Sequence, residues 1–406
     1  MSNNALVYYI RDLIRCEGPI SFARFMEEAL YHPEHGYYST DRCAIGRGGD
    51  YFTSVSVGPL FGRFMAAQFA EVWEKLRRPD DFVIVEQGAH HGEFAGDVLE
   101  TLRACYPDFF SALDYWIVEP FPQLRRRQEG VLRQFAPRME WVDSLDALPP
   151  FCGLHFSNEL VDAMPVHLIV SVRDGADLRW WERRVERTSC GFTFVARPIT
   201  DRALQSQLAK TPSPPGDGYE TEVNLAALNW IEALAQKLKR GMILIADYGL
   251  VRREFYAPNR RTGTLQSYAS HRVLSSPFEE PGESDLTTHV EWTSLAERGA
   301  DCGLTIAGFT DQHHFFTGLL AARPELATVG EKAQALQTLI HPEFLGTRFQ
   351  FLGLTKHFPD AASSGGFKSA REPREKLGLS AHDGPFENPN DFRCGWRVSR
   401  PRGPLP

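Results

Sequence analysis

The sequence lacks several features that would place it at once in a familiar class. Its seven cysteines are scattered and never spaced Cys-x-x-Cys, which argues against a disulfide framework or a structural zinc site and favours a reducing compartment. No apolar run approaches the roughly 20 residues that span a bilayer. The N-terminus resembles neither a secretory signal nor a transit peptide, so we expect a cytoplasmic protein.

Excess positive charge is also missing. Lys and Arg number 44 against 52 Asp and Glu, a net charge of −8, so we expect no nucleic-acid partner. The lack of a long apolar run predicts no membrane span. What the chain does have is an ordinary globular composition, 43% hydrophobic and 24% charged over 406 residues. That length permits either several domains or one large α/β domain with additions.

Short apolar runs alternate with helical periodicity along most of the chain. This order predicts an α/β protein with a mostly parallel, doubly wound sheet. The predicted strands lie at 82–86, 114–119, 139–142, 152–158, 242–247 and 348–356. The predicted divisions are a helical N-terminal region with a Gly-rich loop (1–78), a first core part (79–168), an antiparallel insertion (169–218), a second core part (219–358) and a disordered tail (359–406).

A loop typical of nucleotide binding follows the first core strand, in Glu86-Gln87-Gly88-Ala89-His90-His91-Gly92. Gly88 would permit a tight turn and Gly92 a close approach of backbone to ligand. Ligands of open α/β sheets bind at the carboxyl ends of the strands. There Glu119 could accept from both ribose hydroxyls and Asp143 from an adenine amino group. The alternative is a plain strand–turn–helix corner, which Glu119 at the next strand end disfavours.

The acidic residues at these strand ends favour an adenosine ligand without phosphates. Neither G-x-G-x-x-G nor a P-loop motif is present, and the Glu86 carboxylate would repel a phosphate. S-adenosylmethionine, with its sulfonium and ammonium charges, is the better match. A dinucleotide oxidoreductase is disfavoured by the missing glycine motif.

Polar residues also end the fourth predicted strand, in Ser157-Asn158-Glu159-Leu160-Val161-Asp162-Ala163-Met164-Pro165. A helical turn would put Glu159 and Asp162 on one face, where two carboxylates could orient a cationic acceptor nitrogen. The alternative is structural, with Asn158 capping a short helix that Pro165 ends.

Three further features have plain structural alternatives. Thr53 and Ser54, in the segment that starts at Gly49-Asp50, either cap the following helix or reach the cofactor. The pairs His90-His91 and His313-His314 lack a partner at fixed spacing, and adjacent histidines on a regular element diverge, so we expect no metal site. The long segment 251–290 is interpreted as a solvated surface loop, with a substrate lid as the alternative.

A series of different short motifs runs through residues 18–355, and the ordered set is more specific than any one of them. They are Pro19-Ile20-Ser21, Phe25-Met26, His32-Pro33, Gly36-Tyr37-Tyr38, Gly49-Asp50-Tyr51-Phe52-Thr53-Ser54, Leu60-Phe61-Gly62, the 86–92 loop, Glu119-Pro120, Asn158-Glu159, Asp162-Ala163-Met164-Pro165, Asp247-Tyr248-Gly249, Gly263-Thr264-Leu265 with His271, and 281–290. The series resembles the MidA-like family of class I methyltransferases, which includes the mitochondrial complex I assembly methyltransferase.

The resemblance implies a Rossmann-like class I methyltransferase sheet with a helical N-terminal extension and an antiparallel β insertion. It implies S-adenosyl-L-methionine as the cofactor, bound at Glu86, Gly88, Gly92 and Glu119, and it makes Glu159 and Asp162 candidates to polarise a guanidinium. In the mitochondrial branch the acceptor is a protein arginine, so an arginine-containing respiratory-complex subunit is one candidate partner. Another protein nitrogen and a small molecule stay open.

The complete candidate set combines these implications with the strand-end argument. The catalytic candidates are Asn158, Glu159 and Asp162, and the cofactor-binding candidates are Asp50, Thr53, Ser54, Glu86, Gly88, Gly92, Glu119 and Asp143. One departure from the family pattern keeps a second hypothesis open. The family loop usually is E-x-G-P-G-x-G, and here Ala89 and His90 replace its Pro and middle Gly. A methyltransferase-like binding or assembly protein with weakened catalysis is therefore the alternative.

Overall fold

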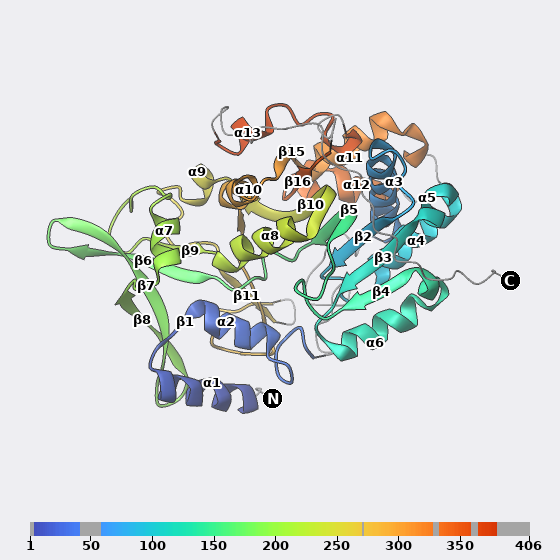
Figure 1. Cartoon of the computed structure of the whole chain (residues 1–406). Coiled ribbons are helices and arrows are strands. Elements are labelled where there is room, and N and C mark those ends of the chain that lie inside the picture. Colours follow the sequence, from blue (N-terminus) through green and yellow to red (C-terminus); the bar gives the residue numbers. More distant parts are fainter. Residues whose placement is uncertain (1–3, 41–57, 270–271, 328–332, 359–363, 380–406) are drawn as a thin grey trace.

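The computed structural model describes residues 4–40, 58–269, 272–327, 333–358 and 364–379. Its centre is an eight-stranded sheet, in which seven strands follow the order β15-β16-β10-β5-β2-β3-β4 and β14 adds to β10 (Figure 1). The strands are β2 (Phe82–Gln87), β3 (Leu113–Val118), β4 (Met139–Val142), β5 (Phe151–Asn158), β10 (Leu238–Leu250), β14 (Val290–Glu291), β15 (Thr305–Asp311) and β16 (Phe349–Lys356).

The five neighbouring strands from β4 to β10 are parallel, whereas β16 runs antiparallel to both β10 and β15. Chain order therefore reverses between β2 and β5. Such a reversal opens a crevice beyond the carboxyl ends of the strands, where doubly wound sheets bind their ligands. The predicted α/β fold with a doubly wound sheet is confirmed, although β15 was not predicted.

Alternate side chains of the central strands enter two separate cores, because successive residues of a strand point to opposite faces of the sheet. Ile84 and Leu244 pack with the helices on one face, and Val85 and Ile245 pack with those on the other. The first face is covered by α3 (Pro59–Lys75), α4 (Glu93–Cys105) and α11 (Gln312–Ala322), and the second by α8 (Leu225–Lys237) and α10 (Trp292–Asp301).

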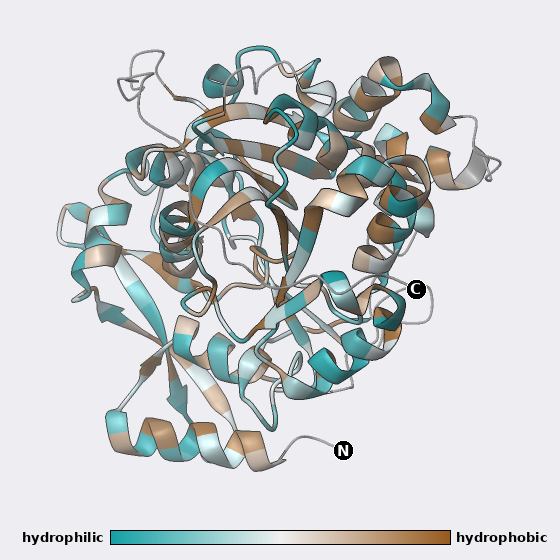
Figure 2. Ribbon diagram, turned by 45° about the vertical axis from the view of Figure 1, so that its right-hand side comes forward, coloured by the Kyte–Doolittle hydropathy of each residue, from teal (hydrophilic) through white to brown (hydrophobic). Residues whose placement is uncertain are grey.

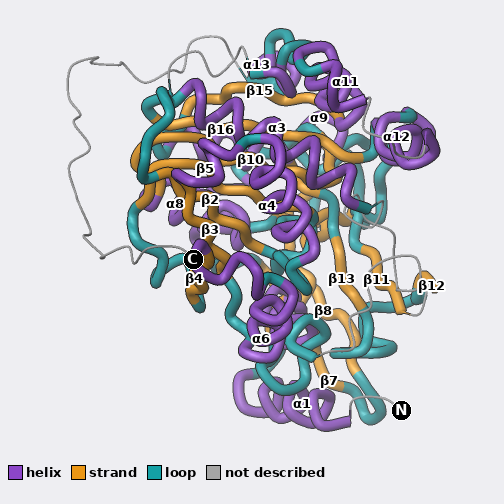
Figure 3. Tube along the Cα trace, turned by 90° about the vertical axis from the view of Figure 1, so that its right-hand side faces the viewer, coloured by secondary structure: helices purple, strands orange, loops and turns teal. Residues whose placement is uncertain are grey.

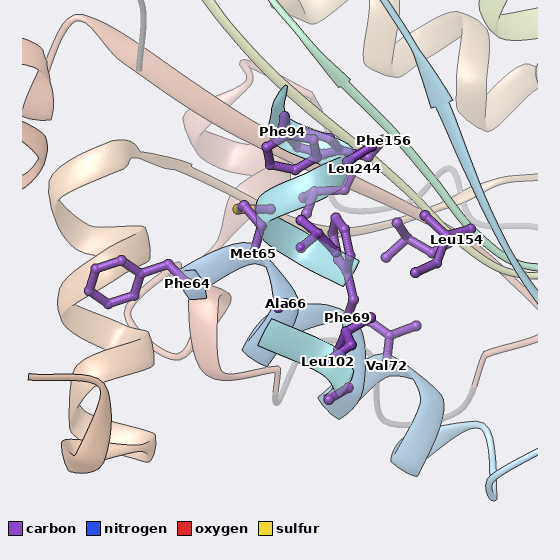
Figure 4. Close-up of a cluster of buried hydrophobic side chains, with 14 of the residues drawn as sticks. Phe64, Met65, Ala66, Phe69, Val72, Phe94, Leu102, Leu154, Phe156 and Leu244 are labelled. Atoms are coloured by element: carbon purple, nitrogen blue, oxygen red, sulfur yellow. The ribbon is translucent and has the colours of Figure 1, made fainter. Parts of the chain in front are cut away.

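Figure 4 shows the first core, in which side chains of α3 and α4 meet those of β5 and β10. Burial on both faces explains why these strands are continuous apolar runs in the sequence. Figure 2 shows much hydrophobic colour on the central strands, and both hydrophobic and hydrophilic stretches on the surrounding helices. Within the ranges that the structure describes, no helix is long and apolar enough to cross a membrane.

A second, antiparallel sheet projects from the core, as the insertion predicts (Figure 1). It has the order β1-β7-β6-β9, with β8 on β7. Its four inserted strands run from His167 to Val223, and β1 joins them from the N-terminal region. The two N-terminal helices pack on this sheet, whereas α3 packs on the core. These elements are α1 (Asn4–Glu17), β1 (Ile20–Ser21), α2 (Phe22–Tyr31), β6 (His167–Asp174), β7 (Asp177–Arg187), β8 (Phe192–Pro198) and β9 (Glu220–Val223).

The interpretation of residues 251–290 as a solvated surface loop is wrong. The segment contains α9 (Arg252–Phe255) and a three-stranded sheet of β11 (Gln266–Ala269), β12 (Arg272–Val273) and β13 (Asp285–Thr287). All three residues of β13 are buried. These strands pair across a long connection, so their Arg, Ser, Pro and Gly content gave no local sign of a sheet.

The expectation that the chain after residue 358 lies outside the fold is wrong for residues 364–379. Backbone N–H groups of Gly365 and Gly366 donate to Glu71 and to Gln68 on α3. The Phe367 ring is 1% exposed and lies on two glycines of neighbouring strands, Gly308 and Gly353. A Cβ at Gly308 would come within 2.2 Å of the Phe367 ring. One aromatic side chain in a polar segment has no periodicity, so the sequence pattern did not reveal this contact.

Other elements surround the two larger sheets. They are α5 (Pro107–Ala112), α6 (Pro122–Val131), a 3-10 helix at Arg133–Arg138, α7 (Arg202–Leu208), a 3-10 helix at Pro324–Ala327, α12 (Ala333–Ile340), a π-helical turn at Pro342–Gly346, a 3-10 turn at Gly365–Phe367 and α13 (Pro373–Lys376).

We expect the replacement Phe367→Ala to lower the free energy of unfolding by about 3–5 kcal/mol, because it leaves a cavity over Gly308 and Gly353. Urea denaturation measures this change. The neighbouring exposed Lys368 supplies the control, and Lys368→Ala should leave the unfolding midpoint unchanged. Equal midpoints for the two variants would show that the segment does not contribute to the core.

Candidate functional site

The loop after β2 has three residues in the left-handed backbone region. Gly88 has φ 82°, His90 φ 46° and Gly92 φ 91°. Glycine adopts this region freely, and histidine adopts it more readily than a β-branched residue does. His90 can therefore occupy the position at which the family loop has glycine. Gly92 donates to the Ala89 carbonyl at 2.8 Å and caps α4. The loop thus turns sharply from strand to helix at the crevice.

Glu86 lies buried at the end of β2, just before this loop. The Tyr115 hydroxyl on β3 donates to Glu86 Oε2 at 2.8 Å. Burial raises the pKa of Glu86 to about 8, although the Tyr115 bond lowers it. The carboxyl group is therefore held in a well-defined place one strand away from Glu119.

Glu119, directly after β3, is 5% exposed and anchors a small network. Its carboxylate accepts from the Phe121 N–H at 3.0 Å and from Gln128 Nε2 at 2.8 Å. Gln128 Nε2 also donates to the His90 carbonyl at 2.8 Å, and Trp141 Nε1 donates to Gln128 Oε1 at 3.0 Å. Burial raises the pKa of Glu119 to about 7, against the lowering effect of these bonds.

Gln128 thus connects the Gly-rich loop, the acid after β3 and the strand β4. No sequence pattern points to Gln128, because it lies in the polar helix α6 and belongs to no motif. Only the packing of α6 against the strand ends reveals its role.

Of the remaining cofactor candidates, one is largely exposed and three lie outside the described residues. Asp143 follows β4, its side chain is 81% exposed, and its carboxylate lies 3.6 Å from Arg125 Nη1. Asp50, Thr53 and Ser54 lie outside the described residues.

The residues after β5 form turns and no helix, so the predicted helical turn and the predicted cap by Asn158 are both wrong. Glu159 has φ 51° and donates its N–H to the Ala246 carbonyl at 3.0 Å. Asn158 Nδ2 donates to Glu159 Oε1 at 2.9 Å. The backbone N–H groups of Val161 and Asp162 donate to a side chain on the neighbouring strand β10. Their acceptor is Asp247 Oδ2, at 2.9 Å from Val161 N and 3.2 Å from Asp162 N.

Buried acids gather behind this turn. Asp162 is 4% exposed and Asp247 is fully buried, and the Tyr248 hydroxyl hydrogen-bonds Asp162. Burial, and then the neighbouring Asp247, raises the pKa of Asp162. Burial raises the pKa of Asp247 to about 8, although its backbone N–H bonds lower it. Asp285 on β13 also approaches, and its Oδ1 accepts from the Tyr38 hydroxyl at 2.6 Å.

A cavity of about 610 Å³ opens at the carboxyl ends of β5 and β10. Two carboxylates, hydroxyls, amides and an imidazole line it together with the single described cation Arg348. The full lining comprises Glu159, Tyr248, Gly249, Leu250, Thr264, Gln266, Tyr268, Asp285, Thr287, His289, Leu345, Thr347, Arg348, Phe349 and Gln350. Glu159 is among these residues and Asp162 is not. Six lining residues come from 251–290, the segment interpreted as a surface loop.

The adjacent histidines of the Gly-rich loop do not diverge as expected. The rings of His90 and His91 lie 3.6 Å apart between centroids, and with Glu93 their ligand atoms fall within 4.8 Å of one another. His91 Nε2, however, lies 3.0 Å from the Arg127 guanidinium, a cation that would repel a metal ion. The absence of a metal site stays a prediction.

This arrangement of strand ends and acids agrees with the comparison to known proteins. Residues 64–310 match the model of methyltransferase family 28, whose members are described as S-adenosyl-L-methionine-dependent methyltransferases. The match spans more than half of the chain and includes the Gly-rich loop, Glu119, the turn after β5 and His289. The chain therefore belongs to this family and is an S-adenosyl-L-methionine-dependent methyltransferase.

Curated and solved relatives support the assignment over nearly the whole chain. The mitochondrial protein arginine methyltransferase NDUFAF7 homolog of Drosophila melanogaster is 28% identical, covering 87% of this chain and 85% of its own. The human protein arginine methyltransferase NDUFAF7, also mitochondrial, is 25% identical, covering 85% and 82%. A Burkholderia thailandensis methyl transfer protein crystallised with S-adenosyl-homocysteine is 31% identical, with a TM-score of 0.79, covering 90% and 95%.

These relatives correct the expected location. The cytoplasmic prediction rested on the lack of a recognisable transit peptide, whereas the curated relatives carry a mitochondrial designation. The cytoplasmic prediction is therefore wrong by this comparison. Composition at one end of a chain is weak information on location, because targeting signals share no fixed motif.

We expect the stability of the cofactor-free protein to fall as pH rises from about 5 to 8, in part through Glu86. The folded-state pKa of Glu86, about 8, lies above its ordinary value of 4.5. Between these values the native state binds more protons than the unfolded state, so the free energy of unfolding decreases with pH. Urea titrations over this range should give a flatter profile for Glu86→Gln. The exposed Glu100→Gln is the control, and a parallel profile for both variants would contradict the role of Glu86.

Proposed function

We propose that the protein transfers a methyl group from S-adenosyl-L-methionine to a guanidinium nitrogen of a protein arginine held in the cavity at the ends of β5 and β10. The observation that carries this proposal is the lining of the cavity, in which the carboxylates of Glu159 and Asp285 face a space of about 610 Å³. A guanidinium presents five N–H donors and pairs well with carboxylates.

We propose that the cofactor lies across the ends of β2 and β3. Glu119 accepts from the ribose hydroxyls, Gly88 and Gly92 allow the loop backbone to approach, and Glu86, held by Tyr115, adds an acidic group at the start of the loop. These residues fit the cofactor. Burial raises the pKa of both Glu86 and Glu119, and the sulfonium and ammonium charges of the ligand would stabilise their ionised forms. Asp143 is the most exposed member of the set, and Asp50, Thr53 and Ser54 stay sequence predictions. When bound, the cofactor supplies an already activated methyl group.

The cofactor loop and the proposed acceptor cavity are neighbours. A Cβ at Gly88 would lie 3.4 Å from Leu160 Cδ1, and Leu160 follows the cavity residue Glu159. We assign different roles to the three catalytic candidates on this geometry. Glu159 contacts the acceptor, Asn158 positions the Glu159 carboxylate, and Asp162 acts from behind the wall by positioning the Tyr248 hydroxyl.

Two exposed apolar side chains beside the cavity favour a protein acceptor over a small molecule. Val273, 68% exposed, pairs across the β11–β12 ladder with the cavity residue Tyr268. Phe344, 51% exposed, precedes the cavity residue Leu345. Figure 3 shows β11, β12 and α12 along the same edge of the molecule. Exposed apolar groups near a site suit contact with a polypeptide, and the curated relatives are named protein arginine methyltransferases.

We expect Glu119→Ala to weaken the binding of S-adenosyl-L-methionine by about 10- to 150-fold, because charge-assisted hydrogen bonds contribute about 1.5–3 kcal/mol. Isothermal titration calorimetry measures the change. The exposed Glu100→Ala should bind like the wild type. An affinity of Glu119→Ala within threefold of the wild type would remove this residue from the cofactor site.

The acceptor is tested with S-adenosyl-L-methionine labelled in its methyl group and protein extract from cells that lack the chain. We expect label in methylarginine after hydrolysis, and about a 10- to 150-fold lower rate for Glu159→Gln, since it loses a charged acceptor of the guanidinium. The exposed Glu254→Gln is the control. Label only in another amino acid would refute arginine as the acceptor. Absence of both cofactor binding and transfer would support the alternative of an assembly protein.

A further inference from the structure

His289 occupies a position in the wall of the cavity that no sequence argument singled out for chemistry. It follows β13, and Asp285, Thr287 and His289 alternate along the chain so that all three line the cavity. Its backbone N–H donates to Thr264 Oγ1 at 3.0 Å. Its ring meets the Tyr248 ring edge-on, with centroids 5.5 Å apart. Two strands and a turn therefore hold the imidazole in place.

The imidazole has an unused ring nitrogen. Nδ1 of His289 is buried and has no hydrogen-bond partner within the part of the chain that the structure describes. Burial, assisted by the charge of Arg260, lowers the pKa of His289 to about 4. The ring is thus neutral at pH 7, with one nitrogen able to accept a proton.

His289 also lines a second, smaller cavity of about 30 Å³. That volume is enough for a water molecule. Polar groups line it, among them the carboxyl groups of Glu222 and Glu291. His289 thus lines both cavities, and an imidazole can take a proton on one nitrogen and release one from the other.

We propose that His289 is the base that accepts the proton lost by the acceptor nitrogen during methyl transfer, and that the small cavity leads this proton away. The inference rests on the proposed function. The nitrogen lone pair forms a bond to the methyl carbon while the carbon–sulfur bond breaks. The electron pair of that bond stays on sulfur as S-adenosyl-homocysteine forms. The N–H proton of the acceptor moves to His289, which leaves a methylated guanidinium with its single positive charge.

The carboxylates of the cavity are less suited to this task than the imidazole. Asp285 accepts from Tyr38, Glu159 accepts from Asn158, and both are needed as anions to hold the guanidinium. Attack by nitrogen adds a second positive charge to the acceptor, which makes its N–H acidic enough for a weak base. A neutral imidazole accepts this proton without giving up an ion pair.

Several titratable groups surround His289 and shape its behaviour. On the acceptor side these are Glu159, Tyr248, Tyr268, Asp285 and Arg348. On the side of the small cavity they are Glu222, Tyr256 and Glu291, and the charge of Arg260 also acts on the ring.

The test is the rate of methylarginine formation by His289→Ala, with labelled S-adenosyl-L-methionine at saturation and protein extract from cells that lack the chain. We expect a loss of about 100-fold or more, with unchanged affinity for S-adenosyl-L-methionine by calorimetry. Added imidazole should restore activity to this variant. The restored rate should rise as pH passes the pKa of the free base, near that of a histidine side chain at about 6.5.

His289→Asn is the second variant, because it keeps a polar side chain in place without a basic nitrogen, and it should be as slow as His289→Ala. The exposed His314→Ala is the matched control, with wild-type activity expected. Wild-type-like rates in both His289 variants, or a slow His289→Ala that imidazole does not restore at any pH, would overturn the role of His289 alone. Failure of the wild type to form methylarginine would overturn the arginine acceptor, and with it this role.

Discussion

A buried carboxylate, Asp247, holds the functional side of the molecule together. It lies on the central strand β10, is fully buried, and accepts from the backbone N–H groups of Val161, Asp162 and Tyr248. The turn after β5 has no helix to satisfy its N–H groups, and leaving buried N–H groups unpaired would cost about 1–3 kcal/mol each. Asp247 accepts from these N–H groups and thereby positions the backbone of the turn that carries Glu159 and of Tyr248.

Other parts of the site follow from this anchored turn. The Thr288 N–H donates to the Asp162 carbonyl at 2.9 Å, which attaches the strand segment of Asp285 and His289 to the same turn. Leu160 lies beside Gly88 of the cofactor loop. The proposed methyl donor and acceptor sites therefore adjoin the same hydrogen-bonded turn. Holding the reacting groups at a defined separation supplies much of the rate of a methyl transfer.

The site is acidic, and most of its acids are buried. Burial raises the pKa of Glu86, Glu119, Asp162 and Asp247, so these groups are held at a cost that a cationic ligand would offset. A sulfonium and a guanidinium are both cations. The net charge of −8 describes the whole chain, whereas the binding of a cation depends on the cluster of acids at these strand ends.

Local pattern in the sequence determined the alternating strands, the antiparallel insertion and the acidic strand ends, because continuous apolar runs and glycine-containing turns arise from contacts between near neighbours. Local pattern could not show the turn after β5, because the spacing of Glu159 and Asp162 suits a helix. The backbone N–H groups there are bound instead by Asp247, which is distant in the sequence. Gln128, the Phe367 contact and the cavity wall of β11–β13 depend on pairing between residues far apart in the chain. Only the tertiary structure decided these features, because their stabilising partners lie on other strands and no local period records them.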